Sequence, residues 1–332
     1  MAITGQVNSP HQYQVILLAQ TGSMGEAETS ERQAVTLDLN EPIDISWDNI
    51  TQDRTKRIGQ QMKRGSDHFA TQSGSFYTAD FEWVVNDGTA LKYLMQGISE
   101  DTSSPYTTAG DFTPATYVSA SANANLFTVV VADPIAANAR TLHSCMLTNL
   151  NLTWDIAGDG GRLRVGGTFY SGYKPTIGAH GLTISEIATT SSFEPVFTAQ
   201  PTKTVGGNDV VIRSMELSMG YPGSRHGFNG VDGGAEVYSR SGEYTCGGSV
   251  SVKYDNNSDE ATAGVLSSFF KGTSKAIAFG GQDVTISIPQ AVYTGYAKSF
   301  DEEGVFVDIP FEGTADGSGQ NLYSITVTTP TS

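Results

Sequence analysis

Residues 149–169 read NLNLTWDIAGDGGRLRVGGTF, and this stretch decides the fold class. Leu150, Leu152 and Trp154 alternate with polar residues, which is the period-two pattern of a strand with one buried face. A glycine-rich turn follows at 157–161, and the alternation then resumes to the end of the stretch. We therefore predict an antiparallel hairpin here.

The same alternation runs along most of the chain and predicts a mainly β protein. It is carried by the segments 35–39, 43–47, 76–85, 126–131, 210–221, 244–254, 284–288, 305–311 and 322–327.

Two short helices are expected between these strands. Apolar residues at helical spacing predict the first over 91–98, and Asp87 is placed to cap its start. The second is expected over 258–269, with acidic residues at its beginning and Gly272 after its end.

The second half of the chain repeats the order of the predicted elements of the first. Strands that begin near residues 76, 126, 146 and 163 match strands that begin near 244, 284, 305 and 322. We expect a first β-domain at 1–175 with an N-terminal arm and a long loop at about 48–75, a linker at 176–205, and a second β-domain at 206–332. Each domain is expected to be a β-barrel or sandwich flanked by one short α-helix. Lysines and prolines are few along these strands, so their edges favour pairing with another subunit.

The net charge of the chain limits the classes of partner that it can bind. The formal net charge is −16, so the surface repels nucleic acid rather than gripping it. An acidic surface that serves solubility alone is the plain alternative.

The cysteines and the apolar segments bear on the compartment. Cys145 and Cys246 are too few for a disulfide framework, and we expect buried free thiols in a reducing environment. The apolar run at 15–19 is too short for a signal peptide and lacks a basic segment before it, and no stretch approaches membrane-spanning length. We expect a protein that is made and kept soluble in a cytoplasm, without membrane contact.

The sequence offers no constellation typical of catalysis or of metal binding. Its five histidines lie far apart, without ligand spacing. Asp255, Asn257 and Asp259 imitate the start of a calcium loop, but Glu260 and Leu266 stand where that loop needs Gly and Glu. We therefore predict that the protein is not an enzyme and that it needs no metal and no cofactor.

Two pairs of segments resemble the closing strands of the major tail tube proteins of tailed bacteriophages, in their duplicated-domain form. The first pair is 142–154, LHSCMLTNLNLTW, with 160–169, GGRLRVGGTF. The second pair is 305–313, VFVDIPFEG, with 322–327, LYSITV.

This resemblance implies a structural virion protein. Duplicated-domain members form homotrimeric rings with pseudo-sixfold symmetry, and the rings stack into a tube through which DNA is ejected. The implied partners are other copies of the chain and other tail proteins, namely the tape measure, the terminator and the baseplate or tip. DNA would pass through the lumen without specific binding, and the protein would be made in the cytoplasm of a host bacterium.

By the same resemblance, the long basic loop is expected to reach a neighbouring ring. Its basic residues are Arg54, Lys56, Arg57, Lys63 and Arg64. The acidic surface that meets them, or lines the lumen, is expected near Asp301, Glu302 and Glu303. A solvated loop and a nucleic-acid patch are the alternatives for the basic segment.

Two other functions stay open. One is another virion β-protein, such as a capsid decoration or baseplate component. The other is a carbohydrate-binding module, for which Tyr170, Tyr173 and Tyr221 are the available aromatic residues.

Overall fold

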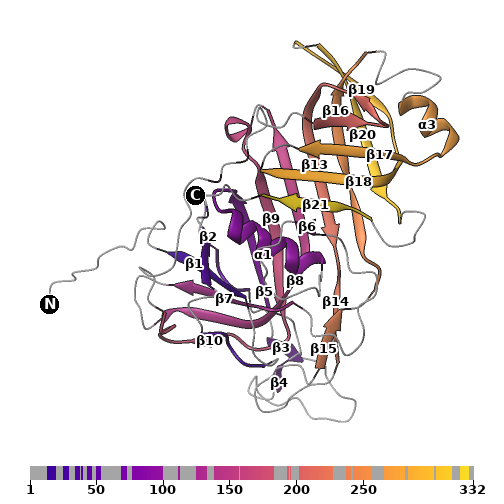
Figure 1. Ribbon diagram of the computed structural model, residues 1–332. Helices are drawn as coiled ribbons and strands as arrows, with labels where there is room; N and C mark the ends of the chain where they lie inside the picture. The colour runs from indigo at the N-terminus through magenta and orange to yellow at the C-terminus, as the bar shows by residue number, and fades with distance from the viewer. Residues whose placement is uncertain are drawn as a thin grey trace, which may run out of the picture.

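The protein is mainly β, as predicted, and its described strands pair antiparallel (Figure 1). The described part of the chain adds two helices, α1 (Gly88–Ser99) and α3 (Val265–Lys271). The computed structural model describes residues 13–19, 25–29, 34–37, 39, 43–46, 50–53, 69–72, 77–99, 111–112, 125–132, 138–156, 158–182, 193, 195, 202–226, 237–240, 242–255, 265–280, 283–302, 304–315 and 322–328.

Strand pairing in the first half follows the order β2–β1–β7–β8–β9–β5. β10 (Thr176–Ile177) pairs with the start of β8. The bounds of the other strands are β1 (Gln14–Ala19), β2 (Ala34–Leu37), β5 (Tyr77–Val84), β7 (Phe127–Ala132), β8 (Arg140–Asp155) and β9 (Arg164–Ser171).

Strand pairing in the second half follows the order β12–β11–β17–β18–β20–β16. These strands are β11 (Thr202–Val205), β12 (Asn208–Asp209), β16 (Thr245–Lys253), β17 (Lys275–Gly280), β18 (Val284–Tyr293) and β20 (Gly304–Gly313). Further strands lie beside them: β13 (Ile212–Gly220) on β16, β19 (Ala297–Asp301) on β20, and β21 (Ser324–Val327) between β18 and β6 (Asp111–Phe112).

The pairing order of the first half therefore recurs in the second, strand for strand. The helices occupy the same place in both orders, because α1 lies between β5 and β7 in sequence and α3 lies between β16 and β17. A separate two-stranded hairpin also precedes β5 and β16 in turn: β3 (Ile50–Asp53) with β4 (Phe69–Gln72), and β14 (Gly223–His226) with β15 (Val237–Arg240).

An irregularity of register marks the same place in both halves. In the pairing of β7 with β8 the register shifts between Phe127 and Val129. In the pairing of β17 with β18 it shifts between Lys275 and Ile277. A β-bulge bends its strand, so both halves turn the chain at the same point of the fold.

A second irregularity follows further along. β8 shifts against β9 just after Leu147. In the second half, Tyr293 of β18 pairs with Phe311 and Ala297 of β19 pairs with Asp308, so one residue is again extra on the side of β18 and β19. Together, β18 and β19 follow the course of the single long strand β8.

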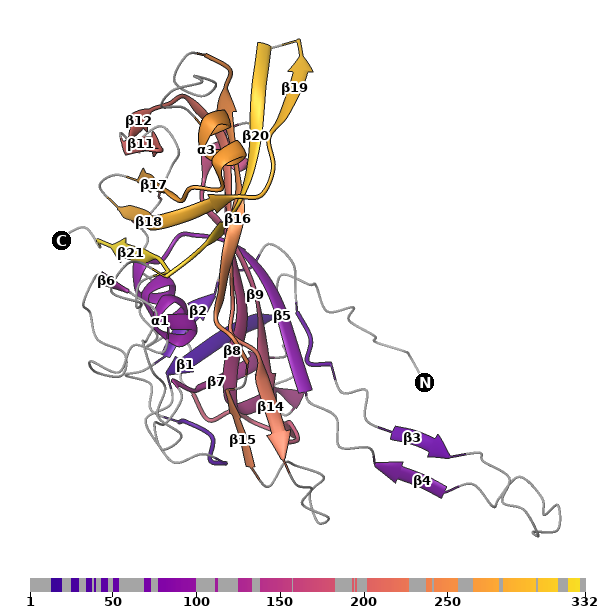
Figure 2. The ribbon, with the colours of Figure 1, turned by 90° about the vertical axis from the view of Figure 1, so that its right-hand side faces the viewer.

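The two halves meet edge to edge. β8 pairs with β13 over the whole stretch from the Asn149–Gly220 pair to the Asp155–Ser214 pair. One continuous sheet, which we call the long sheet, therefore runs in the order β5–β9–β8–β13–β16–β20–β19. Figure 2 shows it nearly edge-on, with α1, β1 and β18 on one side.

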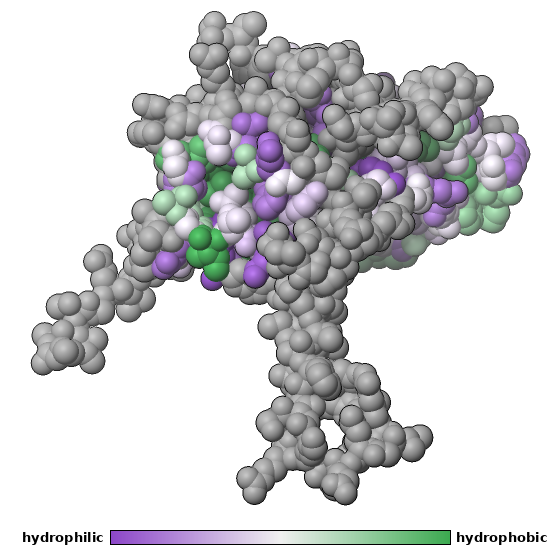
Figure 3. Space-filling model, turned by 90° about the horizontal axis from the view of Figure 1, so that it is seen from below, coloured by the Kyte–Doolittle hydropathy of each residue, from purple (hydrophilic) through white to green (hydrophobic). Residues whose placement is uncertain are grey.

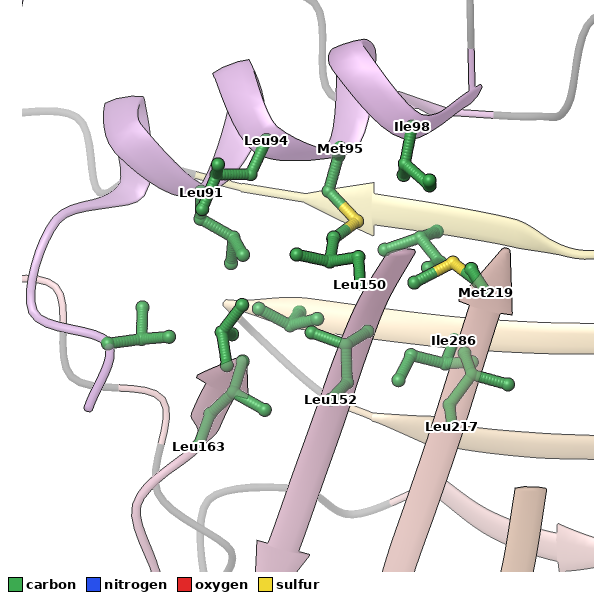
Figure 4. Close-up of a cluster of buried hydrophobic side chains, with 14 of the residues drawn as sticks. Leu91, Leu94, Met95, Ile98, Leu150, Leu152, Leu163, Leu217, Met219 and Ile286 are labelled. Carbon is green, nitrogen blue, oxygen red and sulfur yellow. The ribbon is translucent and has the colours of Figure 1, made fainter. Parts of the chain in front are cut away.

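A hydrophobic core lies against that side and contains residues of both halves. Leu150 of β8 and Met219 of β13 stand opposite each other across the junction. Leu91, Met95 and Ile98 of α1 point toward them (Figure 4), and all are buried. The helix thus covers the seam between the halves.

The predicted hairpin and helices are confirmed in their described parts. β8 and β9 are joined by the turn η4 (Asp159–Gly161), whose Gly160 has φ +69°. Asp87 caps α1, because its Oδ1 accepts hydrogen bonds from Thr89 N at 2.7 Å and Ala90 N at 3.3 Å. α3 ends before Gly272, whose φ is +61°, and the predicted start of that helix at 258 lies outside the described residues.

The predicted matching of the two halves is wrong by one strand. β17, which the alternation pattern did not mark, is the counterpart of β7, and β18 is therefore the counterpart of β8 rather than of β7. β20 then corresponds to β9, and β21, which pairs with the start of β18, corresponds to β10, which pairs with the start of β8.

Two further segments differ from expectation. Residues 15–19, expected only as an apolar run, form most of β1 (Gln14–Ala19). The last residues of the expected linker form β11, which pairs with β17, so the second set of strands begins at Thr202 rather than at residue 206.

A polar sheet face as candidate functional site

The long sheet carries polar side chains on the side away from the core. Directly opposed residues of antiparallel strands point to the same face, so the register aligns these side chains in rows. One row consists of Glu82, Gly166, Asn151, Ser218, Gly247 and Glu312. The next consists of Arg164, Thr153, Glu216, Ser249 and Pro310. We call this surface the polar face.

Among the helices and strands that the structure describes, none covers the polar face along the body of the molecule. In Figure 2 the labelled helices and the second layer of strands lie on the other side of the long sheet, and only the β3–β4 hairpin stands on this side, away from the sheet. The open side therefore spans strands of both halves of the chain.

Acidic groups outnumber basic groups on this face. Within its described strands the bases are Arg164, Arg213 and Lys253, and the acids are Asp80, Glu82, Asp155, Glu216, Asp301, Asp308 and Glu312. Seven acids against three bases give a formal charge of −4. A broad surface of one sign repels polyanions such as DNA, because the phosphate charges dominate that interaction.

Two side-chain contacts order part of the face. Arg164 Nη1 lies 2.6 Å from Glu82 Oε1, and Thr168 Oγ1 donates a hydrogen bond to Asp80 Oδ1 at 2.6 Å. Both partners of the ion pair are largely exposed, so the pair contributes little to stability, about 0–1 kcal/mol. Its effect is to offset one of the few basic charges on the face.

A shallow depression lies in the middle of the polar face. Gly166 leaves it without a side chain at its floor, and its lining comes from β5, β8, β9 and β13. Asp80, Glu82 and Glu216 contribute the acidic part of that lining, and Arg164, which is paired with Glu82, contributes the basic part. Amide and hydroxyl side chains contribute most of the remainder. This donor set suits contact with water and passing solutes better than capture of a phosphate.

The basic residues proposed for the inter-ring loop, Arg54, Lys56, Arg57, Lys63 and Arg64, lie outside the described residues. The strands β3 and β4 on either side of them pair with each other. Figure 2 shows this hairpin projecting from the body of the molecule.

The predicted acidic cluster lies at the end of the β19–β20 hairpin. Asp301 Oδ2 forms an ion pair with Arg213 Nη1 of β13, and its Oδ1 accepts a hydrogen bond from Gly304 N at 3.0 Å. Glu302 is exposed in the turn, and Glu303 lies outside the described residues. Asp301 therefore serves a contact within the chain.

Of the acids of the polar face, Asp301 alone was named as a site residue from the sequence. Alternation shows that Asp80 and Glu82 share a face of their strand, and likewise Asp308 with Glu312. It does not show that these faces join across β8 and β13, because that depends on the pairing of strands far apart in the chain.

The two cysteines are buried and reduced, away from this face. Burial raises the pKa of the Cys246 thiol to about 12 and that of Cys145 further still. Both therefore stay protonated and unreactive near neutral pH.

The described residues form neither a metal-binding cluster nor a membrane-spanning helix. They contain no group of three His, Cys, Asp or Glu side chains arranged to hold a metal ion. None of their helices combines the length and the apolar character needed to cross a membrane.

The lower end of the molecule differs from the core in composition. In the part that the structure describes, Figure 3 shows hydrophilic and hydrophobic residues interspersed over this end.

Comparison with known proteins gave no relative: no family model matches the chain, and no curated protein sequence matches it.

Proposed function

We propose that this protein is a non-catalytic structural subunit of a bacteriophage tail tube. In this proposal the halves are two tandem tail-tube-like domains, three copies close a ring of pseudo-sixfold symmetry, and rings stack into a hollow tube in the virion. DNA passes through that tube during ejection. The tape measure, the terminator and the baseplate or tip proteins are the partners at its ends and in its lumen.

The observation that carries the proposal is the joining of two topologically equivalent halves into one sheet with an open, acid-rich polar face. A repeat that joins its own copy edge to edge is suited to continue with further copies around a ring. The face that such a ring turns inward is then a continuous β-wall, polar on the channel side and apolar on the core side.

The charge of that wall supports passage of DNA rather than its capture. Repulsion between the acids and the phosphates keeps the polymer from adhering. Hydroxyl and amide groups such as those of Thr153, Asn151 and Ser249 keep the surface wetted without adding positive charge.

Negative-stain electron microscopy of the purified protein at increasing concentration tests the proposal. We expect rings of threefold or apparent sixfold outline, and tubes of uniform bore as the concentration rises. Monomers or compact trimers that never stack would contradict the tube and favour a capsid decoration or baseplate component.

A further inference from the structure

The β8–β13 junction shows how one half of this chain binds the next. In its register Trp154 lies opposite Met215, Leu152 opposite Leu217, and Asn151 opposite Ser218. Each half of the chain could carry an equivalent of both edges, so that the edges equivalent to β8 and β13 would lie at the two ends of the long sheet.

The counterpart of the second part of β8 is β19. Both strands follow a bulge of one extra residue, and both pair with corresponding strands, β9 and β20. Leu147 pairs with Phe169 as Tyr293 pairs with Phe311, so counting on from the bulge makes Asn151 the counterpart of Ala297 and Trp154 the counterpart of Phe300.

The counterpart of β13 is the segment 43–46. Ser46 pairs with Thr78 of β5 and exchanges two backbone hydrogen bonds with it, at 2.8 and 3.4 Å. β5 corresponds to β16, and Ser218 holds the equivalent position beside Gly247.

The side chains of the two segments agree with this assignment. Residues 43–46 read IDIS and residues 215–218 read MELS, so an apolar, an acidic, an apolar and a serine residue stand in the same order. Ile45 is 2% exposed and its counterpart Leu217 is 0% exposed. Both segments therefore place their second apolar residue in the core.

The outer edges of β8 and β19 differ in one respect. β13 covers the edge of β8, whereas no described strand covers the edge of β19. Trp154 is 1% exposed and packs against Phe279 of the second half, with ring centroids 4.8 Å apart. Its counterpart Phe300 is 77% exposed. Among the described strands β19 pairs with β20, and none pairs with its outer edge.

We infer that the outer edge of β19 binds residues 43–46 of a second copy of this chain, antiparallel and in the register of the β8–β13 junction. Ala297 then lies opposite Ser46, Lys298 opposite Ile45, Ser299 opposite Asp44, and Phe300 opposite Ile43. This inference rests on the proposed function, for which it names the contact between neighbouring subunits of a ring.

The two edges differ from each other, so the contact is heterologous. Each copy donates β19 at one end and the 43–46 segment at the other, and a chain of such contacts closes only as a ring. Main-chain hydrogen bonds extend the sheet, and Phe300 gains an apolar neighbour in Ile43, which packs against the core of its own copy.

Disulfide trapping tests the register. We would prepare Ser46→Cys, Ala297→Cys and the double variant, since both positions are exposed and directly opposed residues of antiparallel strands lie about 4.5–5.5 Å apart at Cα, which suits a disulfide. The native thiols are buried and do not compete.

We expect the oxidised double variant to form a covalent ladder that ends at the ring size. An equimolar mixture of the two single variants should give dimers and nothing larger, because each copy then has one reactive edge. A control double variant, Ser46→Cys with Lys298→Cys, places the thiols on opposite faces and should not cross-link.

Two outcomes overturn the inference. If microscopy shows rings or tubes while the double variant stays uncross-linked, the proposed function survives and this contact is wrong. If neither assemblies nor cross-links form, both fail. A covalent ring that never stacks supports the contact and contradicts the tube.

A second pair of variants covers the case in which the cysteine variants fold poorly. Phe300→Ser should raise the concentration needed for assembly at least tenfold. Phe270→Ser is the matched control, because Phe270 is 76% exposed and lies on α3 rather than on β19. It should leave assembly unchanged, and equal effects of the two substitutions would overturn the inference.

Discussion

Gly166 and Gly167 are neighbours on β9 that meet different surroundings. A Cβ on Gly167 would lie 2.8 Å from Asn149 O and 2.9 Å from the ring of Phe81. A Cβ on Gly166 would meet only Phe81 O, at 3.5 Å. Glycine is therefore required at the buried position and not at the position on the polar face.

We predict that Gly167→Ala lowers the free energy of unfolding by about 1–3 kcal/mol, the usual cost of overpacking. Gly166→Ala should change it by less than about 0.5 kcal/mol, or stabilise slightly by restricting the unfolded chain. Urea titration followed by tryptophan fluorescence measures both. Equal effects would mean that the close approach at Gly167 relaxes freely.

The Cys246 thiol links stability to alkaline pH. Burial raises its pKa to about 12 in the folded protein, whereas the unfolded thiol titrates near 8.5. Between these values the native state holds a proton that the unfolded chain has released. The resulting stabilisation is present below about pH 8.5 and is lost as the pH rises toward the folded pKa.

We predict that the free energy of unfolding falls as the pH rises from 9 to 11, and that it falls less steeply in Cys246→Ala. The difference in slope is at most about 1.4 kcal/mol per pH unit, the linkage of one proton. Burial also raises the pKa values of Cys145, Tyr293 and Tyr323. The free energy of unfolding should therefore still fall with pH in both proteins. Identical slopes in variant and parent would refute the assignment to Cys246.

At the scale of elements, helix α1 depends on a single capping side chain. Asp87→Ala leaves the amides of Thr89 and Ala90 without the carboxylate that accepts their hydrogen bonds. We expect a loss of about 1 kcal/mol in the free energy of unfolding. Asp87→Asn keeps an acceptor oxygen and should retain most of the stability, and thermal melts of the pair measure the difference. A loss as large in the Asn variant would point to the charge rather than the cap.

The sequence predicted those elements that have one face in the core. The second part of β8 and the strands β9, β5 and β20 show alternation because polar residues fill their other face. β1 was not predicted as a strand because both of its faces are buried. Val15 and Leu17 belong to the main core, and Ile16 and Leu18 belong to a second cluster. Alternation vanishes in such a strand, and a short apolar run does not distinguish strand from helix.

The repeat was visible in the sequence, but its alignment was not. β17 is a short strand of small and apolar residues, KAIAFG, without a polar rhythm. Missing it shifted every later match by one strand. The positions of Glu216 and Glu312 on one surface depend on pairings that span both halves of the chain, and local patterns carry no record of them.

At the scale of the whole molecule, the polar face predicts how charge changes act after assembly. The triple variant Glu216→Lys, Asp308→Lys, Glu312→Lys turns seven acids and three bases into four acids and six bases, from −4 to +2. Before assembly we expect it to bind closed circular duplex DNA in a salt-sensitive way. Its tubes should not bind that DNA, because a closed circle cannot thread a channel.

Reversal of acids away from the polar face gives the control. Glu26→Lys, Asp209→Lys and Glu243→Lys change three exposed acids on other elements. That variant should bind the circular DNA equally before and after assembly, as measured by co-sedimentation. If tubes of the first variant retain the circle, the polar face lies on the outside.

The junction between β8 and β13 has a mechanical consequence. Leu152 and Leu217 face each other across this junction inside one polypeptide. In the proposed ring, half of the junctions between repeats would therefore be held by the continuity of the chain and need no encounter between molecules. The remaining seams, formed through β19, carry Lys298 where the fused seam carries leucine. A strained tube would split there first, and it would come apart in whole subunits rather than in halves.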